Sequence, residues 1–150
     1  MSVVFQHWNT AYFEAIFRAA AEHHAELRTA ISQVGDPIWS MHKKKSSESV
    51  LAGEMILTFF NGGSEKRKLD PAFSVGDSLR TILRQNPQEY VYGEQIFNEL
   101  IVAAWRAGAV RTLRITKDEF LDLLKCEGWN YDAEKHYWTK ASRAPVSLFA

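Results

Sequence analysis

Cysteine is almost absent from this 150-residue chain, which contains only Cys126. A single thiol excludes an internal disulfide and any zinc site built from several cysteines, and it fits a reducing compartment. Near the end of a predicted helix, Cys126 is interpreted as a small core residue rather than a nucleophile. No apolar stretch reaches the length of a membrane span, and no charged-then-apolar leader follows Met1. We therefore expect a cytoplasmic protein without a membrane partner.

Net charge is the second thing that the sequence lacks. Lysine plus arginine and aspartate plus glutamate each number 18, so no overall field draws the chain to nucleic acid or to an anionic membrane. Apolar residues, in contrast, are plentiful: 46% of the chain is hydrophobic and 13% is aromatic. This composition argues against disorder, and the length allows one respectable core or two small ones.

Motifs for phosphate and metal binding are missing as well. None of the eight glycines forms GxGxxG or GxxxxGK(S/T), and no GxSxG sequence is present. The five histidines show no HExxH spacing, and His23 and His24 would point about 100° apart on a helix. The residues alone therefore indicate neither a cofactor site nor a metal site, and they specify no reaction.

The first 63 residues predict a strand, a helix and two further strands. Two valines and a phenylalanine in succession predict a strand at Ser2–Gln6, and apolar residues at helical spacing predict a helix over Thr10–His24. Leu27–Val34 is a second strand candidate and Val50–Phe60 is a third. The third is a nearly unbroken apolar run, which is typical of a strand covered on both faces in an α/β sheet.

A polar and basic segment separates the last two of these strands. It contains Lys43, Lys44 and Lys45, followed by Ser46. Three adjacent lysines in a polar loop are usually a solvated loop tip. They would also suit non-specific contact with phosphate, to which the serine hydroxyl could add a hydrogen bond. These four residues are the candidate contacts with nucleic acid.

The second half of the chain begins with residues 64–76, which have little periodicity and are interpreted as a linker. Asp77 or Ser78 is expected to cap a short helix that ends before Pro87, and a longer helix is predicted over Glu94–Ala107. Gly108 stands where a C-terminal cap belongs.

Three smaller elements follow the longer helix. Arg111–Ile115 is a short strand candidate. Thr116 and Glu119 form a capping box, which opens a helix that ends near Gly128. Alternating aromatic residues then predict a hairpin with a polar tip at Asp132–Lys135.

This order of elements over residues 77–141 is compatible with a small winged-helix unit, in which a helix enters a DNA groove and the hairpin contacts the backbone. Many small α+β modules share the order, and they bind proteins or simply dimerise. The expected recognition helix carries Asp118, Glu119 and Asp122, and acidic side chains repel phosphate. Insertion of this helix into a DNA groove is therefore disfavoured.

Four strings within residues 6–63 resemble the C-terminal end of the catalytic domain of large bacterial and archaeal adenine-specific DNA methylases. The strings are QHW at Gln6–Trp8, YFEA at Tyr12–Ala15, QVGDPIWSMHKKK at Gln33–Lys45 and LAGEMILTF at Leu51–Phe59. The resemblance implies the last part of a Rossmann-like methyltransferase sheet, namely a strand, a helix and the closing antiparallel strand pair.

The functional motifs of that family are missing from this chain. Its members need a Gly-rich loop for S-adenosylmethionine and a (D/N/S)PP(Y/F) motif that holds a flipped-out adenine. The sequences DPI at Asp36–Ile38 and DPA at Asp70–Ala72 lack the second proline and the aromatic residue. The resemblance therefore transfers no catalytic or cofactor-binding residue. We expect no enzymatic activity from the chain alone. We expect S-adenosylmethionine to bind only if an N-terminal part completes the enzyme.

The expected fold class is α/β, or α+β for the whole chain, in four parts. A partial Rossmann-like methyltransferase sheet end occupies residues 1–63, and a linker occupies 64–76. A small helical, winged-helix-like unit occupies residues 77–141, and a tail occupies 142–150.

Two functions follow from these expectations. The first is a non-catalytic C-terminal fragment or subunit of an adenine-specific DNA methylase, which contributes to sheet closure and DNA contact. The second is a stand-alone dimeric interaction module that binds protein, or DNA non-specifically, without enzymatic activity. A sheet remnant exposes an apolar edge that needs a partner. We therefore expect Ser2–Gln6 or its neighbouring strand to pair with a larger methylase chain or, most simply, with a second copy in a twofold homodimer.

Overall fold

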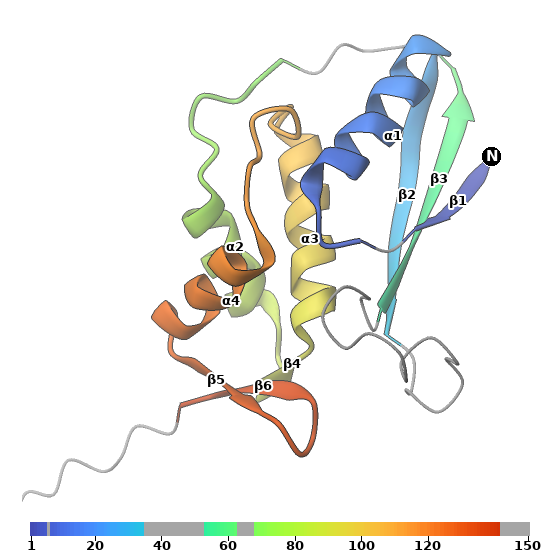
Figure 1. Ribbon diagram of the computed structural model, residues 1–150. Coiled ribbons are helices and arrows are strands. Elements are labelled where there is room, and N and C mark those ends of the chain that lie inside the picture. The colour runs from blue at the N-terminus through green and yellow to red at the C-terminus, as the bar shows by residue number, and fades with distance from the viewer. Residues whose placement is uncertain (6, 35–52, 63–67, 142–150) are drawn as a thin grey trace, which may run out of the picture.

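The computed structural model describes residues 1–5, 7–34, 53–62 and 68–141 (Figure 1). These residues form four helices and two three-stranded antiparallel sheets, so the expected mixed α/β class is confirmed. In chain order the elements are β1 (Ser2–Phe5), α1 (Thr10–Glu22), β2 (Ala25–Val34), β3 (Gly53–Asn61), α2 (Val75–Gln85), β4 (Tyr90–Val91), α3 (Gly93–Arg106), α4 (Lys117–Cys126), β5 (Trp129–Asp132) and β6 (Tyr137–Lys140).

Sheet A consists of the first three strands in the order β1-β3-β2, and β3 is antiparallel to both neighbours. β1 and β2 therefore run in the same direction and are joined by α1. Helices α1 and α3 pack against the same face of this sheet. Phe17 of α1 contacts Phe59 of β3, and Asn98 of α3 donates a hydrogen bond to Ser32 of β2. Figure 1 shows both helices on this side of the strands.

The expectation that both faces of the third strand are covered is wrong. Along β3, Met55, Leu57 and Phe59 are buried, whereas the alternate residue Phe60 is 54% exposed. Among the described residues, helices pack on one face of sheet A only. An apolar run cannot distinguish a strand inside a two-sided sheet from a strand of an antiparallel sheet whose second face is open. The expected part of that strand before Gly53 lies outside the described residues.

The hydrophobic core continues from sheet A into the second half of the chain. Trp8, between β1 and α1, packs against Phe97 of α3 and Phe120 of α4, with ring centroids 4.9 and 5.8 Å apart. The buried hydroxyl of Thr10 donates to the carbonyl of Leu113 at 3.0 Å. The described parts of residues 1–63 and 77–141 thus share one core, and the domain boundaries given above remain a prediction.

Helix α2 starts earlier than the sequence indicated. The N-cap is Ser74, whose hydroxyl accepts a hydrogen bond from the Asp77 amide at 3.4 Å, so the expectation that Asp77 or Ser78 caps this helix is wrong. The extended backbone of Ser74 suits this role. At α3 the expectation was correct, because Gly108 follows the helix with φ +68°, and a Cβ there would lie 2.6 Å from the Lys68 carbonyl oxygen.

The capping box of α4 is confirmed in both directions. The Thr116 hydroxyl accepts from the Glu119 amide at 3.2 Å, and the Glu119 carboxylate accepts from the Thr116 amide at 2.8 Å. Two backbone donors at the start of the helix are thereby satisfied by side chains.

Sheet B contains the predicted hairpin of β5 and β6, with β4 as its third strand in the order β4-β6-β5. The strand expected at Arg111–Ile115 is wrong. Arg111 and Thr112 belong to a turn, in which the amides of Thr112 and Leu113 both donate to the Ala109 carbonyl, and Leu113–Ile115 have no regular secondary structure. Buried Leu113 and Ile115 imitate the alternation of a strand. The two-residue strand β4 was missed because two residues carry no recognisable period.

Candidate functional site

The four predicted nucleic-acid contacts, Lys43, Lys44, Lys45 and Ser46, lie outside the described residues. They belong to the segment between β2 and β3. The structure therefore does not place them relative to any other group, and their contact with nucleic acid remains a prediction.

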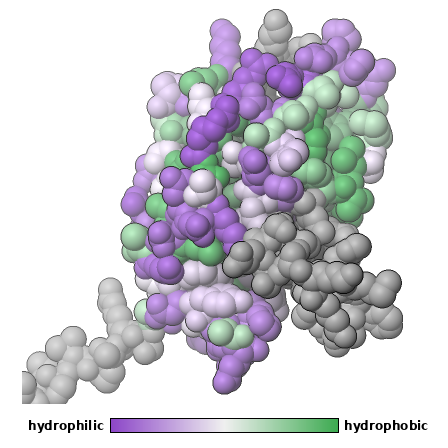
Figure 2. All heavy atoms as spheres, in the orientation of Figure 1, coloured by the Kyte–Doolittle hydropathy of each residue, from purple (hydrophilic) through white to green (hydrophobic). Residues whose placement is uncertain are grey.

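The first candidate surface is the open face of sheet A, which we define as Val4, Ile31, Ile56 and Phe60. The first three form one row across the sheet, because Val4 of β1 and Ile31 of β2 are both paired with Ile56 of β3. Val4 is 59% exposed and Ile31 and Phe60 are each 54% exposed. In the view of Figure 2, hydrophobic residues gather on the side of the molecule where the strands of sheet A lie.

Polar groups border this apolar row. The Arg28 guanidinium lies over the Phe60 ring, 5.3 Å from its centroid, and the hydroxyls of Ser2 and Thr58 are hydrogen-bonded at 3.0 Å. An apolar patch with a polar rim is the usual anatomy of a surface that another protein covers. The outer edge of β1 adjoins the patch, and β1 pairs only with β3 among the described strands.

The outward surface of α4 is acidic, as the sequence indicated. Asp118 and Asp122 are exposed, and the Lys125 ammonium is already paired with Asp122 at 2.9 Å. The Lys117 ammonium lies over the Trp8 ring at 5.5 Å. Acidic side chains repel phosphate, so this surface does not favour insertion of α4 into a DNA groove.

Cys126 lies at the end of α4 and is exposed, so the expectation of a core cysteine is wrong. Phe120 and Leu124 occupy the buried positions of this helix. The next residues along the chain therefore turn toward solvent, because a helical face returns only every three to four residues.

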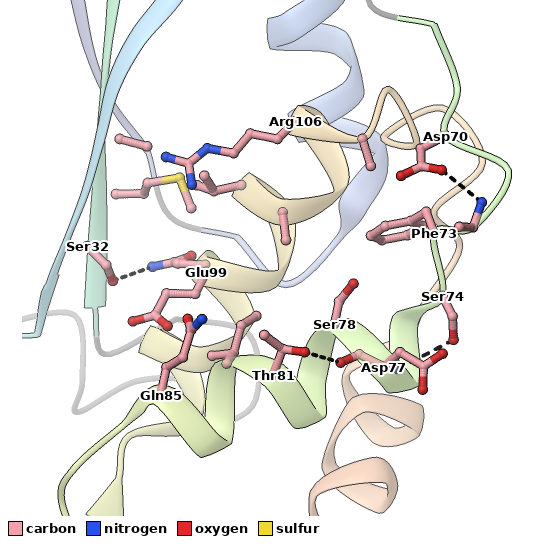
Figure 3. Close-up of a pocket in the computed structure, with 18 residues that line it drawn as sticks. Ser32, Asp70, Phe73, Ser74, Asp77, Ser78, Thr81, Gln85, Glu99 and Arg106 are labelled. Atoms are coloured by element: carbon pink, nitrogen blue, oxygen red, sulfur yellow. Dashed lines mark hydrogen bonds between the residues drawn. The ribbon is translucent and has the colours of Figure 1, made fainter.

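The second candidate surface is a cavity of about 740 Å³ between β2, α2 and α3 (Figure 3). Asn98, on the α3 wall, is only 1% exposed. Its amide nitrogen donates to the Ser32 hydroxyl at 3.0 Å, whereas its side-chain oxygen has no hydrogen-bond partner among the described residues. A buried acceptor without a donor costs free energy, so this oxygen is a point where a bound donor would be favoured.

Two charged groups of α3 line the same cavity. Burial raises the pKa of Glu99, and a hydrogen bond from Gln95 at 3.1 Å partly opposes that shift. Arg106 lies about two turns further along the helix, and its guanidinium makes no ion pair with any described residue. In Figure 3 its side chain extends from α3 toward the strands of sheet A.

Comparison with known proteins adds no assignment, because no family model, no curated protein and no solved structure matches this chain. Within the described residues, no group of three or more His, Cys, Asp or Glu residues is placed to hold a metal ion. In the same part of the chain, no helix is long and apolar enough to cross a membrane. Function is therefore inferred from the surfaces of the fold and from the resemblance of residues 6–63.

The partly buried position of Glu99 predicts a pH-dependent stability. Its pKa is higher in the folded state than in the unfolded state, so its protonated form favours folding. The corresponding stability is present below the unfolded pKa and is lost as the pH rises through the folded pKa. Glu99→Gln cannot ionise, and we expect its stability relative to the parent to increase between about pH 4 and pH 7 in urea unfolding.

The control for this experiment is Glu134→Gln at the exposed tip of the hairpin. Its stability relative to the parent should change less over the same range than that of Glu99→Gln. An equal change in stability with pH for the two variants would show that the burial of Glu99 does not make folding pH-dependent.

Proposed function

We propose that this chain is a non-catalytic C-terminal part of an adenine-specific DNA methylase, in which it completes the catalytic sheet. The observation that carries the proposal is the topology of sheet A. The resemblance implies a strand, a helix and a closing antiparallel strand pair, and β1, α1, β2 and β3 follow in that order. The last strand is antiparallel and lies between the other two.

The open surfaces of sheet A support the same proposal. In a Rossmann-like sheet, helices cover both faces and further strands continue the sheet. Here the outer edge of β1 is unpaired among the described strands, and the open face next to it is apolar. The remaining strands of a methylase would continue from β1, and their helices would cover Val4, Ile31 and Ile56. Covering Val4 and Ile31, which are each more than half exposed, contributes about 1 kcal/mol per side chain.

Methyl transfer itself is assigned to another part of such an enzyme. The Gly-rich loop for S-adenosylmethionine and the (D/N/S)PP(Y/F) motif precede the resembling segment in that family, and residues 1–150 contain neither. In this proposal the chain supplies sheet closure and surfaces for contact, in the reducing cytoplasmic compartment that a single cysteine fits.

The DNA sequence upstream of the Met1 codon tests this proposal directly. We expect either an open frame or an adjacent gene that encodes a Gly-rich loop and a (D/N/S)PP(Y/F) motif. A stop codon and ribosome-binding site before Met1, with no methylase sequence nearby, would contradict it.

The fold and the charge of the second half of the chain are the basis for proposing which part of the chain contacts DNA. The order α2, β4, α3, α4, β5, β6 and the sheet order β4-β6-β5 support a winged-helix-like unit. The acidic face of α4 argues that this unit contacts protein rather than a DNA groove. Contact with DNA is therefore proposed only for the basic segment that contains Lys43, Lys44, Lys45 and Ser46.

Fluorescence anisotropy with a labelled duplex tests that contact. We expect weak binding that decreases as salt increases, because each lysine that neutralises a phosphate releases a counterion. Replacing Lys43, Lys44 and Lys45 together by alanine should weaken binding about tenfold or more at low salt. The matched control replaces three lysines outside this segment by alanine, namely Lys117 and Lys125 of α4 and Lys135 between β5 and β6. No binding at low salt, or equal loss in both triple variants, would contradict a role for this segment.

A stand-alone dimeric module is the second candidate function, and the open face of sheet A is the observation that favours it. The row Val4–Ile56–Ile31 is apolar, and in the dimeric module two copies cover each other's rows about a twofold axis. In that arrangement the same residues of both chains form the interface.

Light scattering at micromolar concentration distinguishes this candidate. The module predicts a dimer, and Ile31→Lys should weaken its association about tenfold or more, because a charge would be buried at the centre of the row. Leu69→Lys is the matched control, since Leu69 is also 54% exposed but is not part of the open face. A monomeric parent chain would exclude the dimeric module and leave the methylase proposal in place.

A further inference from the structure

The cavity beside β2 is lined by residues of β2, α2 and α3, and we call it the β2 groove. Residues of α3, including Val102 and Ala103, form its floor. β2 provides one wall through Ala30 and Ser32, and α2 provides the other. Figure 3 shows the hydroxyls of α2 on the side of α3 opposite to the strands. The groove therefore runs along α3 between an edge strand and a helix.

The β2 wall is an edge strand with unused hydrogen-bonding capacity. Among the described strands of sheet A, β2 pairs with β3 alone. Among the described residues, no backbone group of Arg28–Ser32 hydrogen-bonds on the other side. An edge of this kind is a template for a further strand. The small side chains of Ala30 and Ala103 leave space beside it for a peptide backbone.

The direction of α3 fixes which charge lies at which end of the groove. At one end, Asn98 is hydrogen-bonded to Ser32, near the C-terminal end of β2. At the other end, Trp105 stacks on Phe17. The Phe17 ring also packs on Phe59, whose strand partner is Leu27 near the start of β2. Helix α3 is therefore antiparallel to β2.

Glu99 consequently lies toward the C-terminal end of β2, and Arg106 lies toward its N-terminal end. Seven helical residues separate them, or about 10 Å along the axis. This distance equals about three residues of an extended strand. A strand that adds antiparallel to β2 would place its own C-terminal end near Arg106 and an earlier residue near Glu99.

The free groups of the groove are few and specific. Arg106 makes no ion pair among the described residues, and the Asn98 oxygen has no donor. The other lining carboxylates are engaged, because Asp77 pairs with Arg80 at 2.8 Å and Asp70 accepts from the Ala72 amide at 2.9 Å. Among the described residues, the groove thus has a cation without an anion, Arg106, at one end. It has an acceptor without a donor, the Asn98 oxygen, at the other end.

We propose that the β2 groove binds an extended peptide segment of a partner protein, which adds as an antiparallel strand to the outer edge of β2. A carboxylate at the C-terminal end of the peptide pairs with Arg106. A basic side chain about three residues earlier donates to Asn98 and Glu99. Backbone hydrogen bonds along an edge supply affinity, and the side-chain contacts supply specificity.

Fluorescence polarisation with a defined probe tests this proposal. The probe is a labelled hexapeptide of alternating valine and threonine, with lysine at its third position and a free terminal carboxylate. We expect saturable binding with a Kd between about 1 and 100 µM. The same peptide with a terminal amide should bind about tenfold more weakly, because the charge-assisted bond to Arg106 is lost. N-methylation of alternate backbone amides should abolish binding.

The variants separate specific pairing from general attraction. Arg106→Gln should weaken binding of the acid peptide about tenfold and leave the amide peptide unchanged. Arg84→Gln, on an exposed part of α2 outside the groove, is the matched control and should bind both peptides like the parent. Ile31→Lys should also bind normally, because its side chain lies on the open face. Circular dichroism confirms that each variant is folded.

Three results would overturn the proposal. They are the absence of saturable binding up to about 1 mM probe, equal affinity for the acid and amide peptides, and equal effects of Arg106→Gln and Arg84→Gln. A failure of the methylase or dimer proposals would not change these results, because neither of those proposals uses the β2 groove.

Discussion

The packing of Trp8 between the two halves of the chain is the contact on which the remaining arrangement depends. Its ring lies 4.9 Å from Phe97 and 5.8 Å from Phe120, measured between centroids. Removing a buried aromatic side chain of this kind costs about 3–5 kcal/mol. Because Trp8 belongs to the connection between β1 and α1, it fixes α3 and α4 against sheet A. The position of α3 in turn creates the β2 groove and leaves the opposite face of the sheet open.

The two candidate surfaces follow from one geometric fact, which is that all the described helices that touch sheet A lie on one of its faces. The covered face holds buried residues such as Met55 and Leu57, and at its β2 margin the packing is incomplete. The other face presents an apolar row with a polar rim. An antiparallel sheet can leave one face open in this way, and the described helices leave Val4, Ile31 and Phe60 of sheet A exposed.

Local patterns in the sequence predicted the features that depend on interactions between residues close together in the chain. The capping box of Thr116 and Glu119, the C-terminal glycine Gly108 and the β5–β6 hairpin were all read correctly. Properties that depend on tertiary contacts were not. The turn after Ala109 imitated a strand, and the apolar run of β3 concealed an open face. The β2 groove could not be predicted, because its lining combines distant segments and its key signal is the Asn98 oxygen, which has no hydrogen-bond partner in the described part of the chain.

The long-range contacts of β1 and α1 determine when this chain can fold. The hydroxyl of Ser2 bonds to Thr58, 56 residues later, and Thr10 bonds to the carbonyl of Leu113, 103 residues later. Contacts between residues so far apart form slowly, because a large loop must close first. The side chains of β1 and α1 therefore reach all of their partners only after β3, α3 and the turn before α4 have been made.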